Sequence, residues 1–273
     1  MIKSLVTIFK GFFIGGTMMV PGVSGGSMAM ILGVYERLIE SIASFRKNPA
    51  KNVAFLIKFC IGGLLGIALF SKFVITPLLT KFPLPVSFFF LGAVAGGIPI
   101  IYKTSGIKKF SLNAVIYPLI GMIFVLLIAV IPEGIFSPGN TLSVWSVLIQ
   151  ILGGVIIAVG FILPGISVSQ LLLMLGLYES VISAIDTLNI LPFIPLGIGL
   201  LIGSLLCAKG MEKAMEKYPE PTYLIILGFL IGSLPEIFPG VPMGINIPIC
   251  ILTFVVGFCF IYFLQKLEGK KSK

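Results

Sequence analysis

The feature that most constrains this fold is a broken apolar segment that occurs twice. The two copies span residues 11–45 and 154–188, and each is interrupted by Pro-Gly-x-Ser, at 21–24 and at 164–167. A constant offset of 143 residues relates them and extends to the Gly-x-Tyr-Glu that ends in Glu36 and Glu179. Matching Gly/Pro-interrupted apolar segments in two halves indicate a transporter's binding site. The duplication therefore predicts a transporter built from two related halves.

Composition places these halves in a membrane. Of the 273 residues, 58% are hydrophobic and only 11% are charged, whereas soluble domains carry roughly 25% charged residues. The net charge of +9 comes from Lys and Arg clustered at the ends of apolar segments, which is typical of cytoplasmic loops. Nucleic-acid binding is not expected, because no basic surface with interleaved aromatic residues lies outside the apolar segments.

The duplication continues beyond the broken segments and predicts an all-α polytopic protein with two repeats. Lys81-Phe82-Pro83-Leu84-Pro85 matches Lys217-Tyr218-Pro219-Glu220-Pro221 at an offset of 136 residues. Each repeat therefore contains a broken hairpin followed by three apolar helices. The predicted first repeat is 1–138, with a hairpin at 5–45 and helices at 53–71, 84–102 and 110–131; the second is 139–273, with a hairpin at 143–188 and helices at 192–208, 221–238 and 246–264.

The distribution of positive charge predicts that the repeats are inverted. Lys3 and Lys10 precede the first break, and further basic residues follow the first hairpin and the helices predicted to end at 102, 208 and 264. By contrast, 132–142, 186–195 and 239–247 contain no Lys or Arg. The positive-inside rule then places both termini in the cytoplasm. The first hairpin enters from that side and the second from outside, with Lys72 and Lys81 as exceptions on the outer side.

The length of the first limb favours re-entrant hairpins. The sixteen residues 5–20 would span about 24 Å as a helix, less than the ~30 Å hydrocarbon core. Two short spanning helices would return the chain to the same side, so charge does not separate these alternatives.

The breaks are candidate anion sites. Residues after each Pro-Gly lie at the start of the returning half-helix, where free N–H groups and the positive end of the helix dipole attract phosphate or carboxylate. Glycines allow close approach, and hydroxyl and amide groups add donors. The alternative is that Pro-Gly-x-Ser forms only a turn. The candidate substrate-binding residues are Pro21, Gly22, Ser24, Gly25, Gly26, Ser27, Arg37, Pro164, Gly165, Ser167, Ser169 and Gln170.

Three charged residues near the breaks are also candidates. Glu36 and Glu179 lie at equivalent positions, which we expect toward the far end of each returning half-helix, and could couple transport to a proton gradient. Their alternative role is that of solvated interfacial carboxylates. Arg37 could bind a phosphate bidentately or act as a cation that snorkels to the interface.

The sequence offers little for enzymatic chemistry. It contains no histidine, and its four cysteines lie singly in apolar stretches. We therefore predict no metal, no cofactor and no catalytic residue. Gly-Val-Ser-Gly-Gly at 22–26 matches a nucleophile elbow, but without histidine and without a second copy this match is interpreted as coincidence. A membrane-embedded lipid phosphatase or transferase is the disfavoured alternative.

The motif Val-Pro-Gly-Val-Ser-Gly-Gly-Ser at 20–27, followed by Gly-Val-Tyr-Glu at 33–36, resembles the PopT polyprenyl-phosphate transporter family over nearly the whole chain. The resemblance implies a prokaryotic plasma-membrane protein that returns undecaprenyl phosphate, or a related lipid carrier, to the cytoplasmic leaflet for cell-wall assembly. The chain departs from the family pattern at Met18, where an acidic residue is usual, and at Val168, where glycine is usual. From the residues alone, a small-anion channel or exchanger fits equally well, and a homo-oligomer is compatible with either.

Overall fold

The described residues form helices joined by turns and loops, and they contain no strand. Five described helices are long and apolar enough to cross a membrane, and three shorter apolar helices accompany them. The prediction of an all-α polytopic membrane protein is therefore confirmed. The computed structural model describes residues 2–18, 20, 22–107, 111–134, 144–179, 181, 183 and 193–271.

Within the described residues, the predicted apolar segments coincide with helices, and several helices of the two repeats begin at equivalent positions. Helices α2 and α9 have seven residues each and begin directly after the Ser of Pro-Gly-x-Ser. Helices α6 and α12 both begin at the first proline of the matched Pro-x-Pro. The first repeat contains α1 (Ile2–Thr17), α2 (Gly25–Ile31), α3 (Tyr35–Ala43), α4 (Pro49–Leu65), the π-helix η1 (Gly66–Ile75), α5 (Thr76–Lys81), α6 (Pro83–Thr104) and α7 (Asn113–Ala129). The second contains α8 (Val144–Ile162), α9 (Val168–Met174), α11 (Ile194–Lys217), α12 (Pro219–Gly232), α13 (Leu234–Ile237) and α14 (Asn246–Lys271).

Each returning limb is interrupted a second time, which corrects the expectation of one half-helix. Helix α2 ends at Ile31 and α3 begins at Tyr35. Gly33 between them has φ +61°, and its counterpart Gly176 has φ +66°. This left-handed conformation ends a helix and favours glycine. Glu36 consequently lies in the first turn of a separate helix, not toward the far end of the half-helix that begins at Ser24.

The repeats exchange their last helices. Between the repeats, α6 packs on α14 and α7 packs on α12, while α1 packs on α4 and α8 on α11 within each repeat. Small residues let membrane helices approach closely, and equivalent glycines do so here. Gly92 lies against the backbone of Phe254, and its counterpart Gly228 lies against the backbone of Pro118. This reciprocal packing joins the halves into one body.

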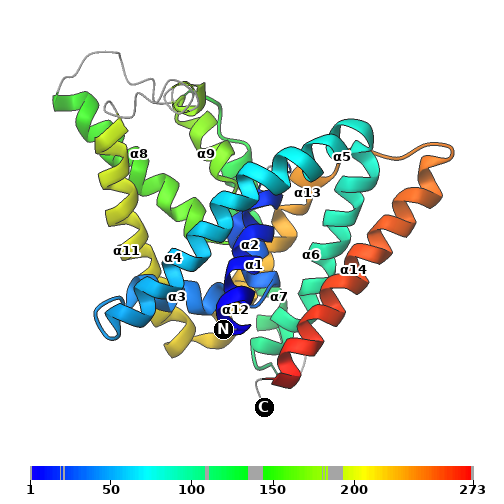
Figure 1. Cartoon of the computed structure of the whole chain (residues 1–273), viewed down its shortest axis with the longest axis horizontal. Coiled ribbons are helices and arrows are strands. Elements are labelled where there is room, and N and C mark those ends of the chain that lie inside the picture. The colour runs from blue at the N-terminus through cyan, green and yellow to red at the C-terminus, as the bar shows by residue number, and fades with distance from the viewer. Residues whose placement is uncertain are drawn as a thin grey trace.

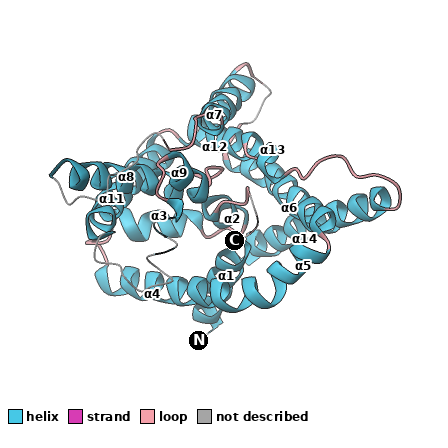
Figure 2. Cartoon of the chain, turned by 90° about the horizontal axis from the view of Figure 1, so that it is seen from above, coloured by secondary structure: helices cyan, strands magenta, loops and turns pink. Residues whose placement is uncertain are grey.

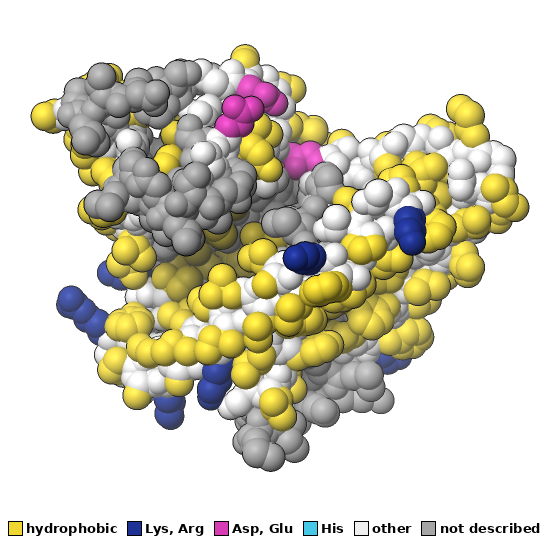
Figure 3. Space-filling model, turned by 45° about the horizontal axis from the view of Figure 1, so that its top comes forward, with side chains coloured by type: hydrophobic (Ala, Val, Ile, Leu, Met, Phe, Trp, Pro, Cys, Tyr) yellow, Lys and Arg dark blue, Asp and Glu magenta, His cyan; other side chains and the backbone are white. Residues whose placement is uncertain are grey.

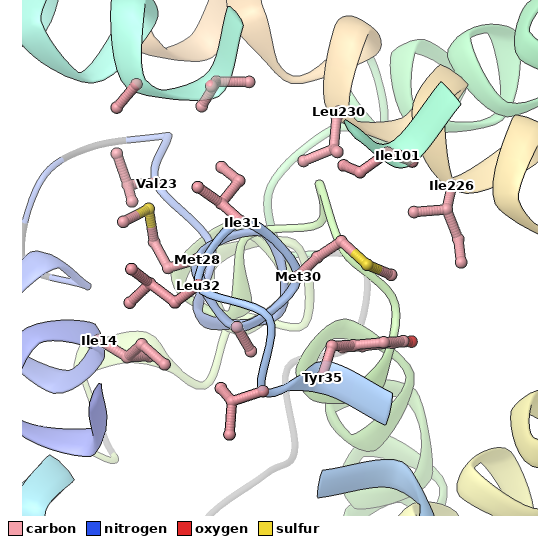
Figure 4. Close-up of a cluster of buried hydrophobic side chains, with 14 of the residues drawn as sticks. Ile14, Val23, Met28, Met30, Ile31, Leu32, Tyr35, Ile101, Ile226 and Leu230 are labelled. Carbon is pink, nitrogen blue, oxygen red and sulfur yellow. The ribbon is translucent and has the colours of Figure 1, made fainter. Parts of the chain in front are cut away.

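The short helix α2 lies at the centre of this body. Figure 1 shows two arms, α8 with α11 and α6 with α14, with α1 and α2 between them, and Figure 2 shows the other helices around α2. Figure 4 shows Met28, Met30, Ile31 and Leu32 extending from different sides of α2, and all four are buried. A helix that is apolar on every side belongs in an interior, so this segment positions the first break inside the protein.

The outer surface is suited to lipid. Large hydrophobic side chains are exposed on α4, η1, α7, α11 and α14, and apolar side chains cover much of the face in Figure 3. Exposed apolar surface on this scale indicates contact with a membrane.

Candidate substrate-binding site

The first break is organised by two serines. Ser24 caps the start of α2 with an extended backbone, and its Oγ accepts a hydrogen bond from the Ser27 backbone N–H at 3.0 Å. The Ser24 hydroxyl also donates to Ser27 Oγ at 2.9 Å. A serine in this position satisfies an N–H group that the helix itself leaves unpaired. The sequence therefore sets this local arrangement through the Ser-Gly-Gly-Ser spacing.

The second break lies directly against these serines. The Gly165 backbone N–H donates to Ser27 Oγ at 2.7 Å and to Ser24 Oγ at 3.1 Å. Gly26 packs on Pro164, with 3.2 Å between the Cα of the proline and the position that a Cβ would take. Residues 141 positions apart thus form one buried polar cluster, in which Ser24 and Ser27 are 4% and 3% exposed.

Glycine is required at both Pro-Gly breaks for two reasons. Gly22 and Gly165 have φ +76° and +82°, which side chains rarely adopt. A Cβ on Gly22 would lie 2.6 Å from the carbonyl carbon of Glu236, and one on Gly165 would overlap the carbonyl oxygen of Phe229. Both breaks therefore pack closely on the α12–α13 segment of the second repeat.

The corresponding polar groups of the second break are more accessible. Ser167 stands at the N-terminal cap of α9 but makes no side-chain capping bond, and it is half-buried. Ser169 is exposed, and Gln170 is half-buried. The structure thus brings Ser24, Gly26, Ser27, Pro164 and Gly165 together. Gly22 packs instead on the backbone of Glu236 and Ile237, and the polar side chains of α9 are more accessible than the buried serines. Pro21 lies outside the described residues.

Tyr35 adds a contact that the sequence analysis did not assign. Its hydroxyl donates to the carbonyl oxygen of Ile162 at 2.7 Å, and Ile162 is the last residue of α8. The last carbonyls of a helix have no partner within it, so this tyrosine stabilises the second break from the first repeat. The signal was present in the sequence, because Tyr35 belongs to the duplicated Gly-x-Tyr-Glu.

The far end of α2 is also held by polar side chains. The Lys10 Nζ donates to the carbonyl oxygen of Leu32 at 2.7 Å, and the Gln265 side-chain amide donates to the carbonyl oxygen of Ile31. These are terminal carbonyls of α2, which need partners when they are buried. Helix α2 is therefore fixed at its start by the serine cluster and at its end by α1 and α14.

Arg37 and Glu36 are directed to a different place. The Arg37 guanidinium bonds Glu40 at 2.8 Å and Asn52 at 3.0 Å, and it lies over the ring of Phe55. Glu36 accepts a hydrogen bond from the Tyr223 hydroxyl. Both residues line a cleft of about 380 Å³ between α3, α11 and α12. The contacts of Arg37 thus tie α3 to α4 and do not reach the serine cluster.

Glu179 does not share the environment of Glu36. It is exposed and follows Gly176 in the second repeat, where no described residue takes the place of Tyr223. Among the described residues, no group of three possible metal ligands lies together. The polar groups bonded at the breaks are two serine hydroxyls and two backbone N–H groups.

Comparison with known proteins gives a consistent result. Residues 14–244 match the model of a family described as undecaprenyl phosphate translocase-like. A polyprenyl-phosphate transporter of Staphylococcus aureus is 32% identical over 278 aligned positions, which cover 98% of each chain. A polyprenyl-phosphate transporter of Vibrio cholerae is 30% identical over 249 positions, which cover 86% of this chain and 78% of the relative. No solved structure matches significantly.

Proposed function

The chain belongs to the undecaprenyl phosphate translocase-like family. On this premise we propose that it transports a polyprenyl phosphate across the plasma membrane, with undecaprenyl phosphate as the main candidate substrate. Transport would return the lipid carrier to the cytoplasmic leaflet. The protein would act without chemical conversion of the lipid, because a transporter leaves its substrate unchanged.

The observation that carries this proposal is the meeting of the two breaks inside the protein. Backbone N–H groups at a helix start bind phosphate well, and the Gly165 N–H and the hydroxyls of Ser24 and Ser27 already converge there. A phosphate oxygen could accept the bond that Gly165 now gives to the serines. We therefore propose that the headgroup separates the breaks and takes over these donors, with Ser167, Ser169 and Gln170 at the accessible side.

The directions of the helices support an inverted arrangement of the repeats. In Figure 1, α1 begins at the lower end of the molecule and α8 at the upper end, while α6 and α12 run in opposite directions. The start of α1 and the ends of α6, α11 and α14 share the lower end, and these ends carry Lys103, Lys217 and Lys266. By the positive-inside rule that end would face the cytoplasm. The repeats would then rock against each other, with re-entrant breaks at the centre.

Coupling is proposed to involve Glu36, whose cleft opens between α3 and α11. Glu179 would be its counterpart in the second repeat. A proton or another ion bound at these carboxylates would supply the driving force, since intramembrane carboxylates commonly take this role.

The test is leaflet exchange of a labelled polyprenyl phosphate in proteoliposomes. The Ser24→Ala, Ser167→Ala double variant should lose most of the exchange. Ser233→Ala is the control for Ser24, because Ser233 is also buried and its hydroxyl donates to the carbonyl oxygen of Leu230 in the preceding helical turn. If wild-type vesicles exchange no lipid but pass chloride or inorganic phosphate, the protein is a small-anion channel. If the labelled lipid is dephosphorylated, it is an enzyme.

A further inference from the structure

A large apolar cavity lies away from the serine cluster, between two pairs of helices. It has a volume of about 760 Å³ and separates η1 and α5 from α6 and α14, with Phe13 of α1 at its inner wall. Ligand pockets for small molecules commonly measure about 300–1,000 Å³. Val74, Leu78 and Phe82 line the cavity and are also exposed at the protein surface, so it opens sideways toward lipid.

A second apolar cavity of about 280 Å³ continues between α1 and α14. The two cavities share Phe13, whose ring lies 5.7 Å from that of Phe70 and 6.3 Å from that of Phe260. Lys10 lines the second cavity. The cavities together form a furrow along α1 and α14, divided in the middle by a group of phenylalanine rings.

One basic side chain stands at the outer mouth of the furrow. Lys81 lines the large cavity and is exposed, and it ends α5 at the upper end of the molecule in Figure 1, opposite the start of α1. Asn246 and Thr253 also line this cavity, and the Thr253 hydroxyl donates to the carbonyl oxygen of Cys250 in its own helix. A single cation above an apolar, aromatic-lined cavity matches a lipid with one anionic headgroup.

The segment that contains η1 is one residue longer in the first repeat than the equivalent segment of the second repeat. Gly66 packs on the Phe12 carbonyl, and Gly203 packs near the equivalent Val155 carbonyl, so these glycines correspond. Lys81 follows Gly66 by 15 residues, but Lys217 follows Gly203 by only 14. The extra residue coincides with the π-helix η1, whereas α11 is α-helical throughout. A π-helix places one more residue in each turn and often marks functional sites.

We propose that this furrow binds the isoprenoid tail of the transported lipid, with the phosphate at Lys81 before it reaches the breaks. The inference rests on the proposed function and adds an entry site on the outer leaflet. The wider π-helical turn of η1 shapes the cavity wall in the first repeat. The aromatic group around Phe13 separates the outer part of the furrow from the part beside Lys10.

The test measures binding directly, with a photoreactive polyprenyl phosphate and the corresponding polyprenyl alcohol in nanodiscs. Mass spectrometry should find the label on residues 70–90 and 246–253. Lys81→Gln should weaken labelling by the phosphate about tenfold, the size expected for one charge-assisted hydrogen bond, and leave labelling by the alcohol unchanged. Lys72→Gln is the matched control, because Lys72 lies beside the ring of Phe73 and does not line the cavity.

A second pair of variants tests the cavity itself. Val74→Trp should fill it and remove labelling by both lipids. Val256→Trp places the same bulk on an exposed position of α14 that does not line it and should have no effect. Labelling spread over the whole surface, or equal competition by a diacyl phosphatidylglycerol, would overturn the proposal in favour of a general lipid cleft.

Exchange in proteoliposomes distinguishes this inference from the proposed function. If wild-type protein exchanges the lipid and Lys81→Gln and Val74→Trp do so equally well, the furrow is not the path, although transport stands. If wild-type protein exchanges nothing but labelling still depends on Lys81 and on the phosphate, the binding site stands and the transport function fails.

Discussion

The two copies of the duplicated motif share the Pro-Gly-x-Ser and Gly-x-Tyr-Glu patterns but lie in different environments. In the first, Ser24 and Ser27 are buried and bonded to Gly165 of the other copy. In the second, Ser167 makes no capping bond and Ser169 is exposed. Tyr35 is 1% exposed, whereas Tyr178 is 36% exposed. Duplicated sequence therefore supplies equivalent groups, and packing decides which copy is sealed.

The largest expected difference between the repeats concerns η1 in the first repeat and its counterpart α11 in the second. Deleting Cys207 from the middle of α11 should prevent folding, because the rest of the helix would rotate by about 100°. Deleting Ala68 from η1 should be tolerated, since the shortened segment can form an ordinary α-helix with the spacing of the second repeat. Size-exclusion profiles and thermal unfolding in detergent would show the contrast. Equal destabilisation by both deletions would contradict the interpretation that η1 accommodates one residue more than α11.

Glycine replacement at the breaks should have the next largest effect. Gly165→Ala combines a left-handed conformation, which costs about 1–2 kcal/mol for other residues, with overlap at the Phe229 carbonyl. We expect a loss of folding free energy clearly above that conformational cost. Gly134→Ala is the control, because Gly134 has φ +76° but no neighbouring atom within 4 Å of a new Cβ. A similar melting temperature for both variants would show that packing at the break is unimportant.

A smaller effect is expected for the two tyrosines of the motif. Tyr35→Phe leaves the buried carbonyl of Ile162 without its partner, which should cost about 1–3 kcal/mol. Tyr178→Phe changes a more exposed residue and should stay within about 0.5 kcal/mol. Thermal unfolding of the purified variants measures both. The comparison fails if the Tyr178 variant is the less stable one.

The smallest difference is expected for the capping serines. Ser24→Ala removes the cap of α2 and should destabilise the protein by about 1 kcal/mol. Ser167→Ala removes a side chain that makes no capping bond and should cost less. The same unfolding measurement applies, and identical losses would mean that the capping bond of Ser24 contributes little.

Several elements were predictable because they depend on local backbone preferences. The apolar segments fell on helices, and the two Pro-Gly pairs marked the breaks. The second interruption, at Gly33, was not predicted. The sequence does show a glycine at the same position of both copies, Gly33 and Gly176. A single glycine within an apolar run is compatible with a continuous helix, so its left-handed conformation was not predicted.

The candidate site was only partly predictable, because its contacts join residues far apart in the chain. Ser24 and Ser27 were identified, but their bonds to Gly165 depend on how the two repeats pack. Arg37 was a candidate either for binding a phosphate or for the interface, and the structure places its guanidinium on Glu40 and Asn52. An arginine reaches whichever partners lie around it, and sequence spacing does not reveal a partner on another helix.

By itself, the sequence determined the membrane environment, the duplication and the positions of the breaks, because composition, helix length and the backbone freedom of glycine act locally. Only the tertiary structure decided that α6 pairs with α14 and α7 with α12, that the serines of one break bind the amide of the other, and that Lys81 stands above an apolar cavity. These features follow from close packing between helices distant in the chain, where backbone contact at glycines selects one arrangement among many.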